Sequence, residues 1–199
     1  IEIIINSKKK IVEIVDTGVG LTENELADTL GTIAKSGTSA FLQELEGEEN
    51  SKDAAKTLIG QFGVGFYSAF MVADKVEVLS RKAGTKQVNS WESDGQSGFS
   101  IGKSDEKQVV GTKIKLFLKK DAKEFAAPDK IKALIKKYSD HISFPINIKE
   151  ADGEIEQVNS ATAIWTKSAS QISKEEYKDF YNSTFGTFDE PFATLHNKS

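Results

Sequence analysis

The chain has 199 residues, of which 38% are hydrophobic and 28% charged, and its net charge at pH 7 is −4. This length allows one full domain with a sizeable core and part of a second. The charge gives no general attraction to nucleic acid, no stretch is apolar enough for a membrane span, and the lack of cysteine excludes disulfides and thiolate metal sites. We therefore expect no nucleic-acid or membrane partner.

The first strands carry an acid in an unusual place. Residues 1–6 already form a strand-like run and the only methionine is Met71, so we expect a fragment of a longer protein. A second strand is predicted at residues 11–15. By the two-residue period of a strand, Asp16 falls on the face of its aliphatic residues. An unpaired carboxylate is costly to bury, so Asp16 is a candidate functional residue.

A glycine-marked turn at residues 16–21 leads into a predicted helix. Residues 22–25 match a capping box, and the apolar stripe that follows predicts a helix ending near Gly37. A shorter helix is predicted at residues 39–45. Residues 47–53 hold no aliphatic or aromatic side chain. Such a stretch is commonly an exposed loop, but its position favours a mobile cover over a binding site.

Three glycines, Gly60, Gly63 and Gly65, precede a helix predicted from Phe66 to Ala73. Glycine permits positive φ and close backbone approach, and the helix N-terminus would offer free N–H groups to an anion. The pattern is typical of phosphate binding, with a tightly packed turn as the alternative. No Gly-Lys-Ser/Thr follows, and no strand immediately precedes the glycines, which excludes a P-loop and the dinucleotide fingerprint.

The rest of the chain completes the domain and begins another. Strands are predicted at residues 75–81, 88–92, 98–102, 112–118 and 145–149, and a helix at 129–142. Thr112 ends an apolar face, as Asp16 does. We expect an N-terminal domain at residues 1–156, a linker at 157–163, and the start of an incomplete second domain at 164–199, because some forty residues cannot close a core.

An inward acid, two glycine turns and a threonine fit one kind of ligand. A carboxylate at the floor of an apolar pocket accepts a hydrogen bond from an exocyclic amine such as adenine N6. The glycine turns allow close approach to the base and to the phosphates. From the residues alone, the prediction is a purine-nucleotide pocket.

Three motifs make the chain resemble the heat-shock protein 90 chaperone family. They are residues 16–20 (DTGVG), 30–38 (LGTIAKSGT) and 59–68 (IGQFGVGFYS). The first and third are shared with the wider superfamily of DNA gyrase, mismatch-repair and histidine-kinase ATPases, whereas the second is specific to the chaperones. The likeness covers essentially the whole chain. Residues 68–74 and the short linker are most similar to the bacterial and mitochondrial branch.

The resemblance implies a fold and a function. The fold is α+β, a two-layer sandwich with helices on one face of a mixed, mainly antiparallel sheet. The function is ATP binding and hydrolysis that drive conformational change in a molecular chaperone assisting protein folding. Unfolded clients and a second copy would be the partners, in the bacterial cytoplasm or the mitochondrial matrix. An ATP-dependent DNA enzyme and a nucleotide-binding pseudo-chaperone without turnover are the alternatives.

The resemblance also assigns roles around the base. Asp16 would bind the adenine amino group, and Thr112 would support it through its hydroxyl and an ordered water. Gly20 would approach the base. Leu21 would line the pocket where relatives often have Met. Thr29 stands where many relatives carry Asn. This residue departs from the family pattern, so the resemblance alone does not support a contact between its side chain and the nucleotide.

The phosphates would be held by a second set of residues. Lys35 would lie near them, with an exposed lysine at a helix end as the alternative. The wrapping loop would comprise Gly60, Gln61, Phe62, Gly63, Val64, Gly65 and Phe66, and residues 37–59 would form a lid. The family's general-base Glu and Mg²⁺-binding Asn lie upstream of Ile1, and its γ-phosphate arginine lies beyond Ser199. We therefore expect ATP or ADP binding, but neither a catalytic residue nor a metal ligand within this chain.

Overall fold

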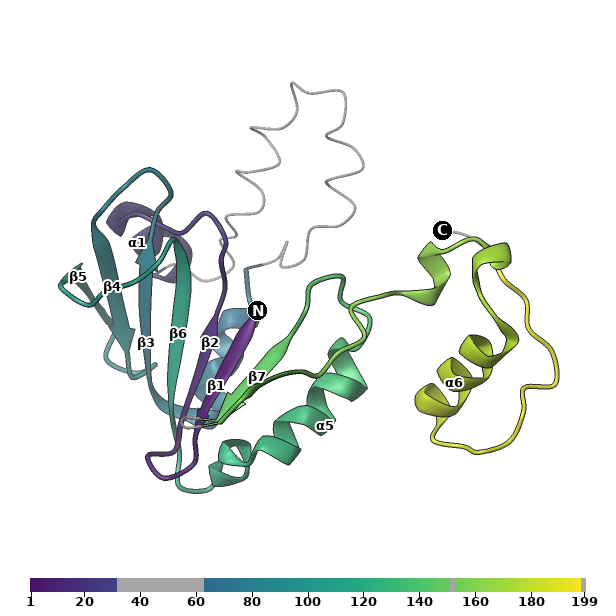
Figure 1. Cartoon of the computed structure of the whole chain (residues 1–199). Coiled ribbons are helices and arrows are strands. Elements are labelled where there is room, and N and C mark those ends of the chain that lie inside the picture. Colours follow the sequence, from purple (N-terminus) through teal and green to yellow (C-terminus); the bar gives the residue numbers. More distant parts are fainter. Residues whose placement is uncertain (32–62, 151–152, 198–199) are drawn as a thin grey trace.

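The computed structural model describes residues 1–31, 63–150 and 153–197, and within them one sheet dominates (Figure 1). Its order is β5-β4-β3-β6-β2-β1-β7-β8. All neighbouring strands are antiparallel except β1 and β7, which are parallel. The strands are β1 Glu2–Asn6, β2 Ile11–Val15, β3 Ala73–Arg81, β4 Val88–Ser93, β5 Phe99–Ser104, β6 Gly111–Leu118, β7 Asn147–Glu150 and β8 Ile155–Gln157.

Helices cover one face of this sheet, which confirms the predicted α+β fold with a mixed, mainly antiparallel sheet. The α-helices are α1 Glu23–Leu30, α4 Ala69–Val72, α5 Pro128–Ser139 and α6 Lys174–Phe185. Short 3-10 turns are η1 Gly65–Ser68, η2 Lys123–Ala126, η3 Ile164–Thr166 and η4 Ala169–Gln171. As predicted, α1 begins with a capping box between Thr22 and Glu25. No helix in the described ranges is long and apolar enough to cross a membrane.

The main core lies between the sheet and the helices α1 and α4, with η2 at its edge. Strand register aligns Ile14, Ile114, Val78 and Trp91 in one row across four strands. Leu26 of α1 closes the core from above and is fully buried. A second cluster surrounds the end of the sheet at β7, where α5 packs; its buried members are Ile5, Ile135, Ile146, Ile148 and Val158. Burial of these aliphatic side chains is the main stabilising contribution.

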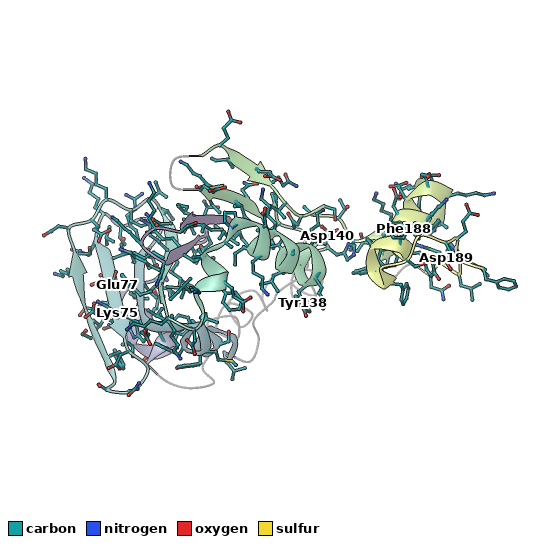
Figure 2. The ribbon with its side chains drawn as sticks, turned by 90° about the horizontal axis from the view of Figure 1, so that it is seen from below. Lys75, Glu77, Tyr138, Asp140, Phe188 and Asp189 are labelled. Atoms are coloured by element: carbon teal, nitrogen blue, oxygen red, sulfur yellow. The ribbon has the colours of Figure 1, made fainter. Side chains whose placement is uncertain are left out.

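The opposite face of the sheet carries charges that pair across strands. Lys75 Nζ lies 2.8 Å from Glu77 and 2.9 Å from Glu92, and Lys115 lies 3.6 Å from Glu77. Figure 2 shows Lys75 and Glu77 together on this part of the sheet. Among the described residues, no helix packs on these charges, so the domain has two layers.

Two predicted helices differ from the observed ones. The expected helix from Phe66 to Ala73 is instead the 3-10 turn η1 followed by the single turn of α4, because Ala73 is extended and opens β3 opposite Leu118. Helix α1 ends at Leu30, with Gly31 as its C-cap. The predicted end near Gly37, the helix at 39–45 and the lid at 37–59 lie outside the described residues.

The sheet also extends further along the chain than predicted. Strand β8 was not expected, and it places Gln157, the first residue of the predicted linker, in the sheet opposite Asn147. Asn159 is buried, and its side chain accepts a hydrogen bond from Ile146 N (2.7 Å) and donates to the carbonyls of Ile142 and Phe144. The predicted division into two domains remains a prediction, with residues 157–159 attached to the first.

The segment with α6 stands away from the sheet (Figure 1). His141, after α5, contacts Trp165 and Phe180 with ring centroids 5.0 and 5.4 Å away. Asp140 accepts hydrogen bonds from Ser160 at the same junction. Figure 2 shows Tyr138 and Asp140 near this junction, and Phe188 and Asp189 at the far end.

Candidate functional site

A row of four polar side chains crosses the inner face of the sheet where the apolar rows end. Thr112 pairs with Ser80, and Ser80 pairs with Asn89. Asp16 follows β2 directly and completes the row beside Thr112. The Ser80 and Thr112 hydroxyl oxygens are 2.9 Å apart, and Ser80 is fully buried. Buried polar groups need such partners, so the row is a connected network.

The carboxylate of Asp16 is held in a fixed orientation. Its Oδ1 accepts hydrogen bonds from Gly18 N (2.7 Å) and Thr112 N (3.3 Å), and the Asp16 backbone N donates to Thr112 O (2.9 Å). Its Oδ2 accepts no hydrogen bond from any residue that the structure describes. A half-buried, oriented carboxylate with one oxygen available is a strong acceptor for a ligand's N–H group.

The turn after Asp16 is clamped against the end of β3. Leu21 N donates to Ser80 Oγ (2.8 Å), and Asn89 Nδ2 donates to Leu21 O (3.3 Å). Gly20 has φ +69°, and a Cβ there would lie only 2.0 Å from Arg81 O. This position therefore requires glycine both for its backbone conformation and for its close packing. Gly20 and Leu21 thus lie beside the polar row, while their contacts with a base remain a prediction.

An apolar cavity of about 440 Å³ adjoins the polar row. Ile14 and Ile114, which line it, lie one alternation step along β2 and β6 from Asp16 and Thr112. Phe66 forms another wall and packs edge-on against Trp91, with ring centroids 5.4 Å apart. An apolar cavity beside a few convergent polar groups is the usual character of a small-molecule site.

The remaining predicted residues divide into three groups. Gly65 and Phe66 line the cavity, while Gly63 has φ +64° and Val64 is exposed. Thr29 does not present a free hydroxyl, because its Oγ1 donates to Glu25 O one turn back in α1. Lys35, Gly60, Gln61 and Phe62 lie outside the described residues.

The expected phosphate-binding helix end is weaker than predicted. Only the 3-10 turn η1 and four residues of α4 follow the glycines, so few aligned peptide dipoles are available. What holds the loop instead is Tyr67, whose hydroxyl donates to Leu30 O at 3.2 Å. The described segment that follows Gly63 is thus hydrogen-bonded to the end of α1.

Glu25, in the first turn of α1, is an acid that follows the turn and is not part of the row. Burial opposes its charge, but hydrogen bonds from Lys82 and Thr22 outweigh burial and hold the pKa of Glu25 below its usual value. It forms an ion pair with Lys82 and caps α1. A carboxylate stabilised in this way is a poor general base.

Ser80 and Asn89 belong to the candidate site, and the sequence analysis did not identify them. The sequence pattern could have identified Ser80, because it follows Val76 and Val78 at a spacing of two and so falls on the inner face. The position of Asn89 depends on the pairing of β3 with β4, which alternation alone does not give. Across the described ranges, no group of three or more His, Cys, Asp or Glu could hold a metal ion.

Comparison with known proteins gives a consistent result. Residues 1–122 match the family described as histidine kinase-, DNA gyrase B-, and HSP90-like ATPase, and residues 147–199 match the family described as Hsp90 protein. The chain is 47% identical to "Chaperone protein HtpG" of Roseobacter denitrificans, over 100% of this chain and 30% of that protein.

Two further relatives carry the same name. Those of Paramagnetospirillum magneticum and Rickettsia rickettsii are 48% identical, over 94% and 92% of this chain and 29% of each protein. The chain thus spans about 30% of the length of these relatives. The match at residues 147–199 favours a chaperone over a DNA enzyme of the same superfamily.

Proposed function

Since the chain belongs to the family of histidine kinase-, DNA gyrase B- and HSP90-like ATPases, and to the heat-shock protein 90 chaperones within it, we propose that it carries most of an ATP-binding site. The whole protein would couple ATP binding and hydrolysis to conformational change and assist the folding of client proteins. Residues 1–156 would be the nucleotide-binding domain and residues 164–199 the start of the next.

The observation that carries this proposal is the free oxygen of Asp16. Two backbone N–H groups fix Oδ1, and Oδ2 is left to accept the adenine amino group. Thr112 would support the same contact through its hydroxyl, which Ser80 orients. The ring would rest on the apolar cavity beside Phe66. Gly20 and Leu21, which lie beside the polar row, would approach the ring from that side.

Affinity for the phosphates would come from residues beyond this row. Gly63, Val64 and Gly65 would join Gly60, Gln61 and Phe62 in wrapping them, with Lys35 nearby. Thr29 would contribute little directly, because its hydroxyl is already used within α1. Mg²⁺, which neutralises the phosphate charges when bound, would be held outside the described residues. The proposed partners of the full protein are unfolded client proteins and a second copy of itself. Its proposed location is the bacterial cytoplasm or the mitochondrial matrix.

Asp16→Asn tests the proposal sharply. Asn can still accept both backbone hydrogen bonds at Oδ1, so the turn should stay folded, while an amide donor replaces Oδ2 and faces the adenine amine. Leaving one buried donor unpaired, with loss of a charged acceptor, should cost about 2 kcal/mol or more, or roughly thirtyfold in ADP affinity. Isothermal titration with ADP measures it.

The exposed acid Asp121 offers a matched control. Asp121→Asn makes the same chemical change away from the polar row and should leave ADP affinity unchanged. Thermal unfolding of both variants separates lost binding from lost folding. An Asp16→Asn protein that folds and binds ADP as tightly as the parent chain would remove Asp16 from the site.

A further inference from the structure

A second cavity, of about 650 Å³, opens on the outer face of the sheet at the end of β3. Its floor is one row of paired residues, Arg81, Val88 and Ser104, from β3, β4 and β5. Residues 105–109 form a wall. Because Ser80 faces inward, Arg81 faces the opposite side of the sheet. This cavity therefore lies behind the polar row, separated from it by the thickness of the sheet.

Two residues that line this cavity carry a buried nitrogen donor without a partner among the described residues. Arg81 Nε and Gln108 Nε2 have no hydrogen bond to any residue in the described part of the chain. Gln108 is only 8% exposed, so bulk water does not solvate it freely. An unmet buried donor costs free energy, and native proteins hold few of them. Two such donors on residues that line one cavity favour an acceptor that lies outside the described residues.

The charges around the cavity favour an anion. Arg81, Lys86 and Lys107 line it, and none of the three forms an ion pair within the ranges that the structure covers. Two acids, Asp105 and Glu106, line it as well, which leaves a net charge of +1. A guanidinium fork and an amide NH₂ offer donors only, and they match an oxygen-bearing anion better than a neutral ligand.

We propose that this cavity binds a small oxyanion, of phosphate or carboxylate type, held by the Arg81 guanidinium and the Gln108 side-chain amide. Lys86 and Lys107 supply long-range attraction from the rim. The proposal is independent of nucleotide binding, because it uses the outer face of the sheet and none of the residues of the polar row.

Thermal unfolding of the chain in phosphate or acetate, with sodium chloride compensating to constant ionic strength, tests the proposal. At an anion concentration ten times Kd, binding raises the ratio of folded to unfolded protein by a factor of about eleven. This converts to roughly 1.4 kcal/mol of stabilisation and a rise in Tm of roughly 3 to 6 °C for a chain of this size. The two anions are titrated separately, so the response shows whether a tetrahedral or a planar oxyanion fits. A rise with either anion supports the proposal only if Gln108→Leu and Arg81→Met both lose it.

Gln108→Leu gives the sharpest signature. It removes the unmet donor, so the chain without added anion should be as stable as the parent or more stable, yet the anion-dependent rise should disappear. Arg81→Met should lose the rise as well. Lys103→Gln removes one positive charge from an exposed position of β5 that does not line the cavity, and it should keep the rise.

A second readout is independent of stability. The side-chain amide resonances of Gln108 should shift during a phosphate or acetate titration, whereas those of Gln157, on β8, should not. Phosphate bound at the glycine loop would raise Tm in all variants alike. Only the portion of the Tm rise that both Gln108→Leu and Arg81→Met lose is therefore assigned to the cavity. The proposal is overturned if neither anion exceeds chloride in effect, or if both variants keep the full rise.

Discussion

Replacing Gly20 by alanine tests whether the turn after Asp16 is held by close packing and not merely by backbone flexibility. Gly20 and Gly84 have similar backbones, with φ +69° and +79°. An added Cβ at Gly84 would meet nothing within 4 Å, whereas at Gly20 it would lie 2.0 Å from Arg81 O and 2.9 Å from Lys82 N. The two substitutions therefore share the conformational cost and differ only in the clash.

The magnitudes follow from these two terms. A left-handed conformation costs a residue with a Cβ roughly 1–2 kcal/mol, which is the whole effect expected for Gly84→Ala. At Gly20, neighbouring backbone must also move, and overpacking adds about 1–3 kcal/mol. Gly20→Ala should thus destabilise the chain by roughly 2–5 kcal/mol.

Urea unfolding of both variants against the parent chain measures this difference. Moving the turn should also break the hydrogen bond from Leu21 N to Ser80 and displace Asp16, so ADP affinity should fall in Gly20→Ala and stay unchanged in Gly84→Ala. Equal losses of stability in the two variants would refute the packing argument. A destabilised Gly20→Ala with unchanged ADP affinity would separate the turn from the nucleotide site.

Three further predictions concern specificity, pH and turnover. GTP should bind roughly fivefold to 150-fold more weakly than ATP, because its O6 would set an acceptor against Asp16 at a cost of about 1–3 kcal/mol. Equal competition by GTP would show that Asp16 does not select the base. Burial opposes the charge of Asp140, but hydrogen bonds from Ser160 and Lys136 outweigh it and lower its pKa. The ionised carboxylate of Asp140 therefore stabilises the fold above pH 3.8, the usual pKa of an Asp, and this stabilisation is lost as the pH falls below that value. Asp140→Asn should flatten the acid side of the stability–pH curve, and an unchanged acid side would contradict this. This chain should not hydrolyse ATP measurably, because our proposal assigns Asp16 to the base and Glu25 is paired with Lys82. Phosphate release assays should detect turnover only in a longer protein that includes the Glu predicted upstream, and turnover by these 199 residues would overturn the assignment.

The alternation of strands made the polar row partly predictable. Asp16 and Thr112 were both recognised as polar groups ending an apolar face, because period two is visible in a single strand. Their adjacency was not visible, since it depends on the antiparallel register that places Ile14 opposite Ile114. Asn89 needed the register of a second pair of strands, and register is set by the whole sheet.

Local sequence misled where tertiary pairing decides the outcome. The apolar run from Phe66 has no Gly or Pro and predicts a helix, but Ala73 gains a strand partner in Leu118, and the helix is cut to one turn. Strand β8 has three exposed residues and no alternation to mark it. It exists because β7 offers it an edge, which no local pattern reveals.

The part of the proposed site that selects the base is formed by the fold itself. Thr112 and Ser80 lie in paired strands, and Asp16 is oriented by two backbone N–H groups, so these groups need little ordering when a nucleotide binds. In our proposal, contacts to the phosphates would instead involve Lys35 and the glycine loop, which would meet every nucleoside triphosphate alike. The ratio of ATP to GTP affinity therefore measures the polar row, while the ratio of ATP to ADP affinity measures the phosphate contacts. Substitution at Asp16 should change the first ratio and substitution at Lys35 the second, so the two halves of the site can be examined separately.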